Sequence, residues 1–246
     1  MGLVSKIKAV LRRRGLNFCS TDHLGVNVEV DLSRLQADRP FKNIFDVGGN
    51  FGQSAIKFAQ AFPKAKILSF EPVPDSFRKL LENTADIQNI HAFDNGFGDR
   101  AGSFKIQLQP NAGGNSLLAE KSVQGSVEVR IETIDAFVVE KGINTIDLLK
   151  IDVEGFELQV LQGASEMLAR GGVRHVFAEC VFAADPVFPH TDFFELHRVL
   201  VGFGFCFVAS YAESFRLADG CALGNVLYSL KSRLPARADG RIHNIY

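Results

Sequence analysis

The chain has 246 residues, of which 46% are hydrophobic and 22% are charged, and its formal net charge is −1. These values suit one α/β domain with a sizeable core, and they provide no basic field of the kind that holds nucleic acid. We therefore expect no nucleic-acid partner. No stretch of about 18 apolar residues predicts a membrane span, and four widely spaced cysteines without metal-ligand spacing suit a reducing cytoplasm.

Residues 1–40 are expected to form an N-terminal helix and a lead-in segment. Residues 3–14 mix apolar and basic side chains in a short amphipathic pattern. This pattern predicts a helix packed on the domain, and contact with a membrane surface or a partner is the alternative. The main domain is assigned to residues 41–232 and a C-terminal tail to residues 233–246.

Strand-like and helix-like segments alternate from residue 43 onward. This alternation predicts an α/β fold with a Rossmann-like, doubly wound and mostly parallel sheet. No helix separates the last two strands, so the last strand should run antiparallel to its neighbours. The predicted strands are 43–47, 66–70, 90–94, 146–153, 175–181, 206–210 and 225–230, and the predicted helices are 53–62, 74–83, 134–139, 156–168 and 192–201.

Two segments in the middle of the chain change to a period of two. Apolar and polar residues alternate over 104–109 and again over 127–132. Such alternation predicts a small antiparallel β insertion with one exposed face, which could pair in a homodimer. Residues 111–125, rich in Gly, Asn and Ser, form a long loop between these strands.

The first predicted strand ends in the sequence Asp46-Val47-Gly48-Gly49-Asn50-Phe51-Gly52-Gln53. A dinucleotide-binding turn has the spacing G-x-G-x-x-G, which lets backbone amides approach a pyrophosphate. Here the spacing is D-x-G-x-x-x-G, with Asn50 in the position of the second glycine. A carboxylate at Asp46 would repel phosphate but suits the ammonium and sulfonium charges of S-adenosylmethionine. A tight strand-to-helix turn without a ligand is the alternative.

The second and third strands also end in polar residues. Glu71 follows the strand 66–70, about 20 positions after the glycine-rich turn, where an acidic residue reaches ribose hydroxyls in nucleotide-binding βαβ units. Asp94 and Asn95 end the third strand and could reach an adenine, although capping of a turn explains them equally well.

The fourth strand ends in the carboxylates Asp152 and Glu154, and Glu157 follows them. An unpaired carboxylate is costly to bury, so charge at this position needs a partner. The partner could be a cofactor ammonium, an acceptor hydroxyl, a metal ion or a helix N-terminus. The helix dipole could explain Glu154 and Glu157, but it explains Asp152 less well. Glu179 ends the apolar run Val176-Phe177-Ala178 of the next strand and is expected at the same edge of the sheet.

The segment Phe182–His190 brings aromatic residues and one histidine close to that edge. A histidine beside a helix start is more often a capping or packing residue. His190 is also the histidine best placed to act as a general base near pH 7. Together with residues 111–125, this segment is expected to shape an acceptor pocket.

Taken together, these motifs resemble the FkbM family of methyltransferases over roughly residues 43–181. The run Lys150-Ile151-Asp152-Val153-Glu154-Gly155 is specific, whereas the glycine-rich turn is shared by many class I methyltransferases. Three further elements contribute to the resemblance: Phe70-Glu71-Pro72, Thr133-Ile134-Asp135 and Val160-Leu161-Gln162-Gly163-Ala164.

The resemblance implies a class I methyltransferase sheet, S-adenosylmethionine as the methyl donor, and O-methylation of a sugar, glycan or polyketide-type small molecule. Asp152 and Glu154 would then line the place where donor and acceptor meet. The residues that would hold the cofactor are Asp46, Gly48, Gly52 and Glu71, and their neighbours Asn50, Gln53, Asp94, Asn95 and Asp152 are further candidates.

Methyl transfer to a hydroxyl is an in-line displacement in which one proton must leave. Our hypothesis assigns that proton to Asp152, Glu179 or His190. Asp152, Glu154 and Glu179 could instead bind magnesium, but the simpler expectation is chemistry without a metal. A nicotinamide-dependent oxidoreductase and a catalytically inactive nucleotide-binding module are the alternative functions.

Overall fold

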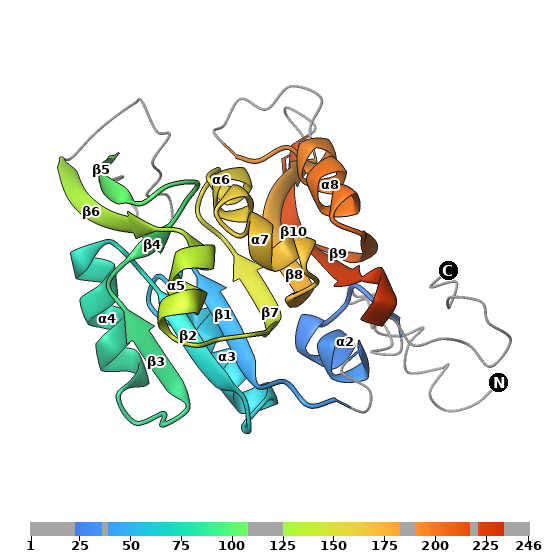
Figure 1. Ribbon diagram of the computed structural model, residues 1–246, viewed down its shortest axis with the longest axis horizontal. Coiled ribbons are helices and arrows are strands. Elements are labelled where there is room, and N and C mark those ends of the chain that lie inside the picture. The colour runs from blue at the N-terminus through green and yellow to red at the C-terminus, as the bar shows by residue number, and fades with distance from the viewer. Residues whose placement is uncertain (1–22, 36–38, 108–124, 183–189, 217–220, 234–246) are drawn as a thin grey trace, which may run out of the picture.

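The computed structural model describes residues 23–35, 39–107, 125–182, 190–216 and 221–233 (Figure 1). Several features expected from the sequence lie outside these residues. They are the helix over 3–14, the loop over 111–124, the segment 183–189 and the tail over 234–246.

A seven-stranded sheet forms the centre of the molecule, in the order β3-β2-β1-β7-β8-β10-β9. The strands from β3 to β8 in this order run parallel, and β10 runs antiparallel to both of its neighbours. This confirms the predicted sheet and its antiparallel last strand. The strands are β1 (Asn43–Val47), β2 (Lys66–Phe70), β3 (Ile90–Phe93), β7 (Ile146–Ile151), β8 (Val173–Phe182), β9 (Phe205–Arg216) and β10 (Cys221–Leu230).

Helices cover both faces of the sheet, as the strand–helix alternation predicts (Figure 1). On one face lie α2 (Val28–Leu35) and α3 (Gln53–Ala61), packed on alternate residues of the strands such as Ile44, Ile67 and Leu148. The opposite face is covered by α5 (Ile134–Glu140), α6 (Glu157–Gln162), α7 (Ser165–Ala169) and α8 (Phe193–Gly202), and α4 (Pro74–Thr84) lies beside β3.

The helix expected over 156–168 is in fact two helices, α6 and α7. Gly163 lies at the break, where a Cβ atom would come within 1.9 Å of the Gly98 carbonyl oxygen. Asp135 then accepts hydrogen bonds from the backbone amides of Glu166 and Met167, both at 2.9 Å. The carboxylate thus satisfies amides of the first turn of α7, which accounts for the Thr133-Ile134-Asp135 element.

The β insertion is a three-stranded sheet of β4 (Gly96–Phe97), β5 (Gly102–Gln107) and β6 (Ser126–Glu132). β5 and β6 are antiparallel, as predicted, whereas β4 is a two-residue strand that runs parallel to β6 and was not predicted. Ile106, Val129 and Ile131 are buried with Val73 in a small apolar cluster. This cluster joins the insertion to the carboxyl end of β2.

None of the helices in the described part of the chain combines the length and the apolar character that crossing a bilayer requires.

Candidate active site

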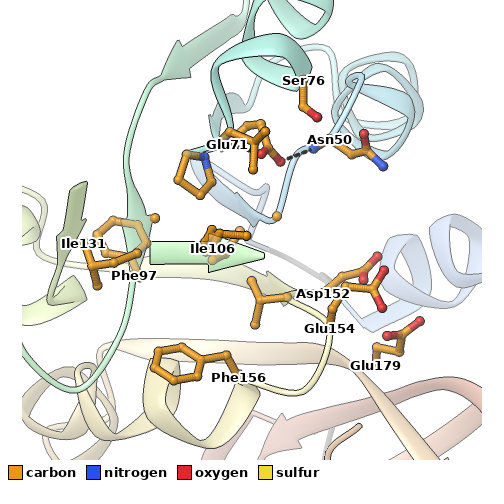
Figure 2. Close-up of a pocket in the computed structure, with 16 residues that line it drawn as sticks. Asn50, Glu71, Ser76, Phe97, Ile106, Ile131, Asp152, Glu154, Phe156 and Glu179 are labelled. Atoms are coloured by element: carbon orange, nitrogen blue, oxygen red, sulfur yellow. Dashed lines mark hydrogen bonds between the residues drawn. The ribbon is translucent and has the colours of Figure 1, made fainter. Parts of the chain in front are cut away.

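A cavity of about 260 Å³ opens at the carboxyl ends of β1, β2 and β7, between the main sheet and the β insertion (Figure 2). Ligands of open α/β sheets bind at this edge. Carboxylates gather at one end, and apolar side chains line much of the rest. The lining residues are Val47, Gly48, Asn50, Glu71, Pro72, Val73, Ser76, Gly96, Phe97, Ile106, Ile131, Asp152, Val153, Glu154, Phe156 and Glu179.

Glu71 is fixed at the cavity wall by two backbone amides. Its Oε2 accepts a hydrogen bond from the Asn50 amide and its Oε1 accepts one from the Val73 amide, both at 2.9 Å. Burial raises the pKa of Glu71 above its ordinary value, while the two amides favour the ionised form. The carboxylate therefore has a fixed orientation, and each oxygen keeps a lone pair for a further donor.

The glycine-rich turn approaches β7 so closely that no side chain fits at Gly48. This residue has φ +78°, and a Cβ atom would lie 1.8 Å from the Asp152 carbonyl oxygen. Asn50 also has a positive φ, 45°, and its backbone N–H points at the Glu71 carboxylate. Gly48 and Asn50 line the cavity, whereas Gly52 packs under α4 against Leu80.

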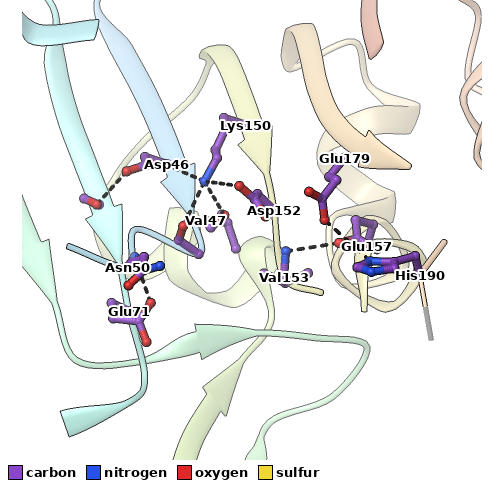
Figure 3. A network of polar contacts seen from close by, with 12 residues as sticks. Asp46, Val47, Asn50, Glu71, Lys150, Asp152, Val153, Glu157, Glu179 and His190 are labelled. Carbon is purple, nitrogen blue, oxygen red and sulfur yellow. Dashed lines mark hydrogen bonds and ion pairs between the residues drawn. The ribbon is translucent and has the colours of Figure 1, made fainter. Parts of the chain in front are cut away.

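The structure corrects the place expected for Asp46. Its side chain is 0% exposed, lies outside the cavity lining, and contacts Lys150 and Ser69 instead (Figure 3). Ser69 Oγ donates to Asp46 Oδ2 at 2.8 Å, and Lys150 Nζ lies 3.0 Å from Asp46 Oδ1. Asp46 is therefore placed apart from the cavity lining, with its charge paired to Lys150 in the interior.

Lys150 begins the motif Lys150–Gly155, and the structure gives this lysine a role that the sequence motif does not indicate. Its ammonium donates to the carbonyl oxygens of Val47 and Gly48 and lies 3.5 Å from Asp152 Oδ2. Burial alone would lower the pKa of Lys150, but the carboxylates of Asp46 and Asp152 raise it above its ordinary value. The lysine thus links the glycine-rich turn to the end of β7. A lysine within the apolar run Ile146–Ile151 indicates such a link in the sequence, because a buried ammonium needs a charged or hydrogen-bonding partner.

Three predicted residues meet beside the acidic end of the cavity: Glu154 and Glu179 line it, and His190 contacts both from outside the lining. His190 Nδ1 lies 3.7 Å from Glu179 Oε2 and 4.0 Å from Glu154 Oε2. Glu154 has φ 55°, a conformation uncommon for a residue with a side chain. Burial, together with the nearby carboxylates of Asp152 and Glu157, raises the pKa of Glu154 to about 8. Asp152 also faces this end of the cavity (Figure 2).

Glu157 fixes the turn that carries Asp152 and Glu154. Its Oε1 accepts hydrogen bonds from the amides of Val153, at 3.0 Å, and Gly155, at 3.2 Å, and its other oxygen accepts one from the Thr191 hydroxyl. Burial raises its pKa above the ordinary value. Because Thr191 follows His190, these bonds also position the histidine beside the turn.

Three other predicted residues lie away from the cavity lining. Gln53 is exposed at the start of α3, and Asp94 is exposed and pairs with Arg130 at 3.8 Å. Asn95 is buried, and its Nδ2 donates to the Gly96 carbonyl oxygen at 3.3 Å. The apolar wall of the cavity was not assigned from the sequence. It comprises Val47, Pro72, Val73, Phe97, Ile106, Ile131, Val153 and Phe156.

The strand order, the antiparallel β10 and the cavity at the strand ends define a class I, Rossmann-like methyltransferase fold. Residues 46–205, more than half of the chain, match the family described as Methyltransferase FkbM domain. The chain therefore belongs to the FkbM methyltransferase family. The resemblance seen in the sequence motifs is confirmed.

Curated relatives share about 30% of their residues with the matched part of the chain. The methyltransferase sdnD of Sordaria araneosa is 31% identical, with 59% of this chain and 66% of that protein covered. The 2-O-methyltransferase NoeI of Sinorhizobium fredii is 28% identical (58% and 64% covered). The hexuronic acid methyltransferase AglP of Haloferax volcanii is 29% identical (64% and 64% covered). The chain thus spans just under two thirds of the length of these relatives.

Among solved structures, the fibrillarin of Aeropyrum pernix with bound S-adenosyl-L-methionine is 14% identical and has a TM-score of 0.46. The alignment covers 80% of this chain and 74% of fibrillarin.

Proposed function

We propose that this chain transfers a methyl group from S-adenosylmethionine to a hydroxyl oxygen of a sugar, glycan or polyketide-type small molecule. Family membership supports methyl transfer as the reaction class. The choice of donor and the roles of individual residues rest on the charges of the cavity.

The observation that carries the proposal is that, in the part of the chain that the structure describes, the charged side chains lining the cavity are all acidic. Its lining includes the carboxylates of Glu71, Asp152, Glu154 and Glu179, and no lysine or arginine belongs to it among the described residues. Such a wall repels the pyrophosphate of a nicotinamide dinucleotide and attracts ammonium and sulfonium groups. The preference for a cationic donor over a phosphate therefore rests on these four lining residues and not on Asp46.

The residues also fit the other parts of the donor. Glu71 is placed to accept hydrogen bonds from ribose hydroxyls, because its carboxylate is oriented by two amides. The apolar residues Phe97 and Ile131 line the cavity away from Asp152 and Glu179, and they offer a surface for an adenine ring (Figure 2). The aminoacyl end would then lie toward Asp152 and Gly48.

Bound S-adenosylmethionine supplies an electrophilic methyl group, so the chain has to align an acceptor oxygen and remove its proton. Asp152, Glu179 and His190 are the candidate proton acceptors. The contacts at 3.7 and 4.0 Å bring His190 close to Glu179 and Glu154, which supports a shared role. Lys150 and Glu157 position the turns that carry these groups.

The class of acceptor is inferred from relatives and from a second cavity. The printed names of NoeI and AglP describe a 2-O-methyltransferase and a hexuronic acid methyltransferase. A cavity of about 220 Å³ meets Asp152 and Lys150 from the side of α2 and α3. Its polar lining suits a hydroxylated molecule and includes Asn27, Glu29, Ser54, Lys57, Tyr211 and Asn225.

Calorimetric titration of the full chain tests the donor. S-adenosylhomocysteine should bind with one site per chain, and NAD should give no heat. Binding of NAD instead would support an oxidoreductase and contradict the proposal. Binding of S-adenosylhomocysteine without methyl transfer to any member of a panel of sugars, uronic acids, glycans and polyketides would support an inactive binding module.

The proton acceptor is tested with Asp152→Asn, Glu179→Gln and His190→Gln. At least one variant should lower turnover by tenfold or more while its affinity for S-adenosylhomocysteine stays within about threefold of the wild type. Asp86→Asn is the matched control, because that carboxylate is exposed in the turn before β3 and lies outside the cavity lining. Full turnover in all three variants would contradict the hypothesis.

A further inference from the structure

Glu154, Glu179 and His190 come from three separate parts of the chain and meet beside the end of the cavity that Glu154 and Glu179 line. Glu154 lies in the turn after β7, Glu179 lies within β8, and His190 stands shortly before α8. One donor atom from each side chain lies within 4.8 Å of the other two. Glu179 and His190 face each other in Figure 3, and Glu154 lies beside Glu179 in Figure 2.

We propose that these three side chains bind one divalent cation of the manganese or zinc type. Ligand atoms at about 2.0–2.2 Å from a shared ion lie roughly 3 to 4.2 Å from one another, depending on the bond angle. His190 Nδ1 lies within this range of both carboxylates, at 3.7 Å from Glu179 and 4.0 Å from Glu154. One imidazole and two carboxylates form a donor set that suits zinc or manganese.

The surrounding charges favour a cation at this point. Asp152 and Glu157 add two further carboxyl groups near Glu154, and both contribute to the electrostatic field that acts on it. Lys150 lies 3.0 Å from Asp46 Oδ1 and 3.5 Å from Asp152 Oδ2, and its charge offsets only part of the negative field at Glu154. A divalent ion at Glu154, Glu179 and His190 would offset the repulsion among these carboxylates.

The role of such an ion rests on the proposed methyl transfer. The cation would bind the acceptor hydroxyl oxygen and lower its pKa, and the proton would pass to the nearby carboxylate of Asp152. The oxygen lone pair then forms the bond to the methyl carbon while the carbon–sulfur bond breaks and its electron pair stays on sulfur. This assigns Glu179 and His190 as ligands and departs from the metal-free chemistry expected from the sequence.

The test is manganese binding by the full chain after treatment with EDTA, followed by electron paramagnetic resonance and calorimetry. We expect one Mn²⁺ per chain, with at least tenfold weaker binding in His190→Gln and in Glu179→Gln. Asp86→Asn should bind as the wild type does, because its carboxylate is exposed in the turn before β3 and lies outside the cavity lining. Thermal unfolding without metal shows whether each variant retains the fold.

Two results would overturn the cation site: no binding of either Mn²⁺ or Zn²⁺ to the wild type, or binding that His190→Gln and Glu179→Gln leave unchanged. A parallel titration with S-adenosylhomocysteine separates this outcome from the proposed function. Mn²⁺ binding without S-adenosylhomocysteine binding would support the cation site and contradict the proposed methyl donor. S-adenosylhomocysteine binding without Mn²⁺ binding would support the methyl donor and contradict the cation site.

Discussion

Lys150 Nζ lies 3.0 Å from Asp46 Oδ1, and neither side chain is more than 3% exposed. The sheet register explains the contact, because Asp46 is paired with Lys150 on β7 and with Ser69 on β2. These three residues form a polar row across adjacent strands, next to the apolar row of Ile44, Ile67 and Leu148. The row supports the turn that lines the cavity.

Replacing Lys150 by methionine should lower the free energy of unfolding by about 3–5 kcal/mol, because it leaves the buried Asp46 charge without its ammonium partner. Urea denaturation measures the change. Lys64→Met is the matched control, since Lys64 is exposed in the turn before β2 and should change the stability by less than about 0.5 kcal/mol.

The double variant Lys150→Met with Asp46→Asn separates charge from packing. It should be more stable than Lys150→Met alone, because the carboxylate that lost its partner is gone. If the two substitutions simply add, the ion pair is not what makes Lys150 important for stability.

Glu71→Gln should weaken binding of S-adenosylhomocysteine about 10- to 100-fold. An amide side chain loses the negative charge and one of the two acceptor oxygens that bind the Asn50 and Val73 amides. Calorimetry measures the affinity. Glu82→Gln, on the exposed surface of α4, should bind as the wild type does, and an equal loss in both variants would exclude a specific role for Glu71.

Much of the fold could be predicted from the sequence because its elements are locally encoded. The runs at β1 and β2 end where predicted, and the antiparallel β10 follows from the absence of a helix before it. The break between α6 and α7 could not be predicted, since it depends on a close approach between Gly163 and Gly98 from another element. The two-residue strand β4 is too short for a periodic signal.

Glu71, Asp152, Glu154 and Glu179 all line the cavity, as their places along the strands led us to expect, and their roles stay predictions. Polar residues after parallel strands share one edge of the sheet, so their gathering follows from topology. Asp46 was misplaced because its orientation depends on the pleat. Side chains two residues apart on a strand share a face, and Ile44 packs on the α2 and α3 face. Asp46 therefore points to the same face, where it pairs with Lys150.

Gly48→Ala should destabilise the chain far more than Gly142→Ala, although both glycines have a positive φ. At Gly142 a Cβ atom meets nothing within 4 Å, so only the backbone cost of about 1–2 kcal/mol applies. At Gly48 the Cβ atom would lie 1.8 Å from the Asp152 carbonyl oxygen, which forces the turn and β7 apart. Thermal unfolding and S-adenosylhomocysteine binding of both variants check this, and similar results for the two would contradict the close approach.

His175 should make the stability of the chain fall in mild acid. Burial, with the nearby Arg174 guanidinium, lowers its pKa from 6.5 to about 3, while Asp147 acts in the opposite direction. The unfolded chain therefore binds a proton that the folded chain does not, so this contribution is fully present above about pH 6.5 and is lost as the pH falls toward 3. From pH 7 to pH 5 the loss is on the order of 2 kcal/mol.

Urea denaturation at both pH values, on the wild type and on His175→Gln, measures this contribution. The variant should lose about 2 kcal/mol less than the wild type between pH 7 and pH 5, whatever its stability at pH 7, because it has no group to titrate at this position. His23→Gln, which removes an exposed histidine, should keep the wild-type difference. If His175→Gln shows the same decrease as the wild type, the acid sensitivity originates elsewhere, and His175 is protonated as readily in the folded chain as in the unfolded one.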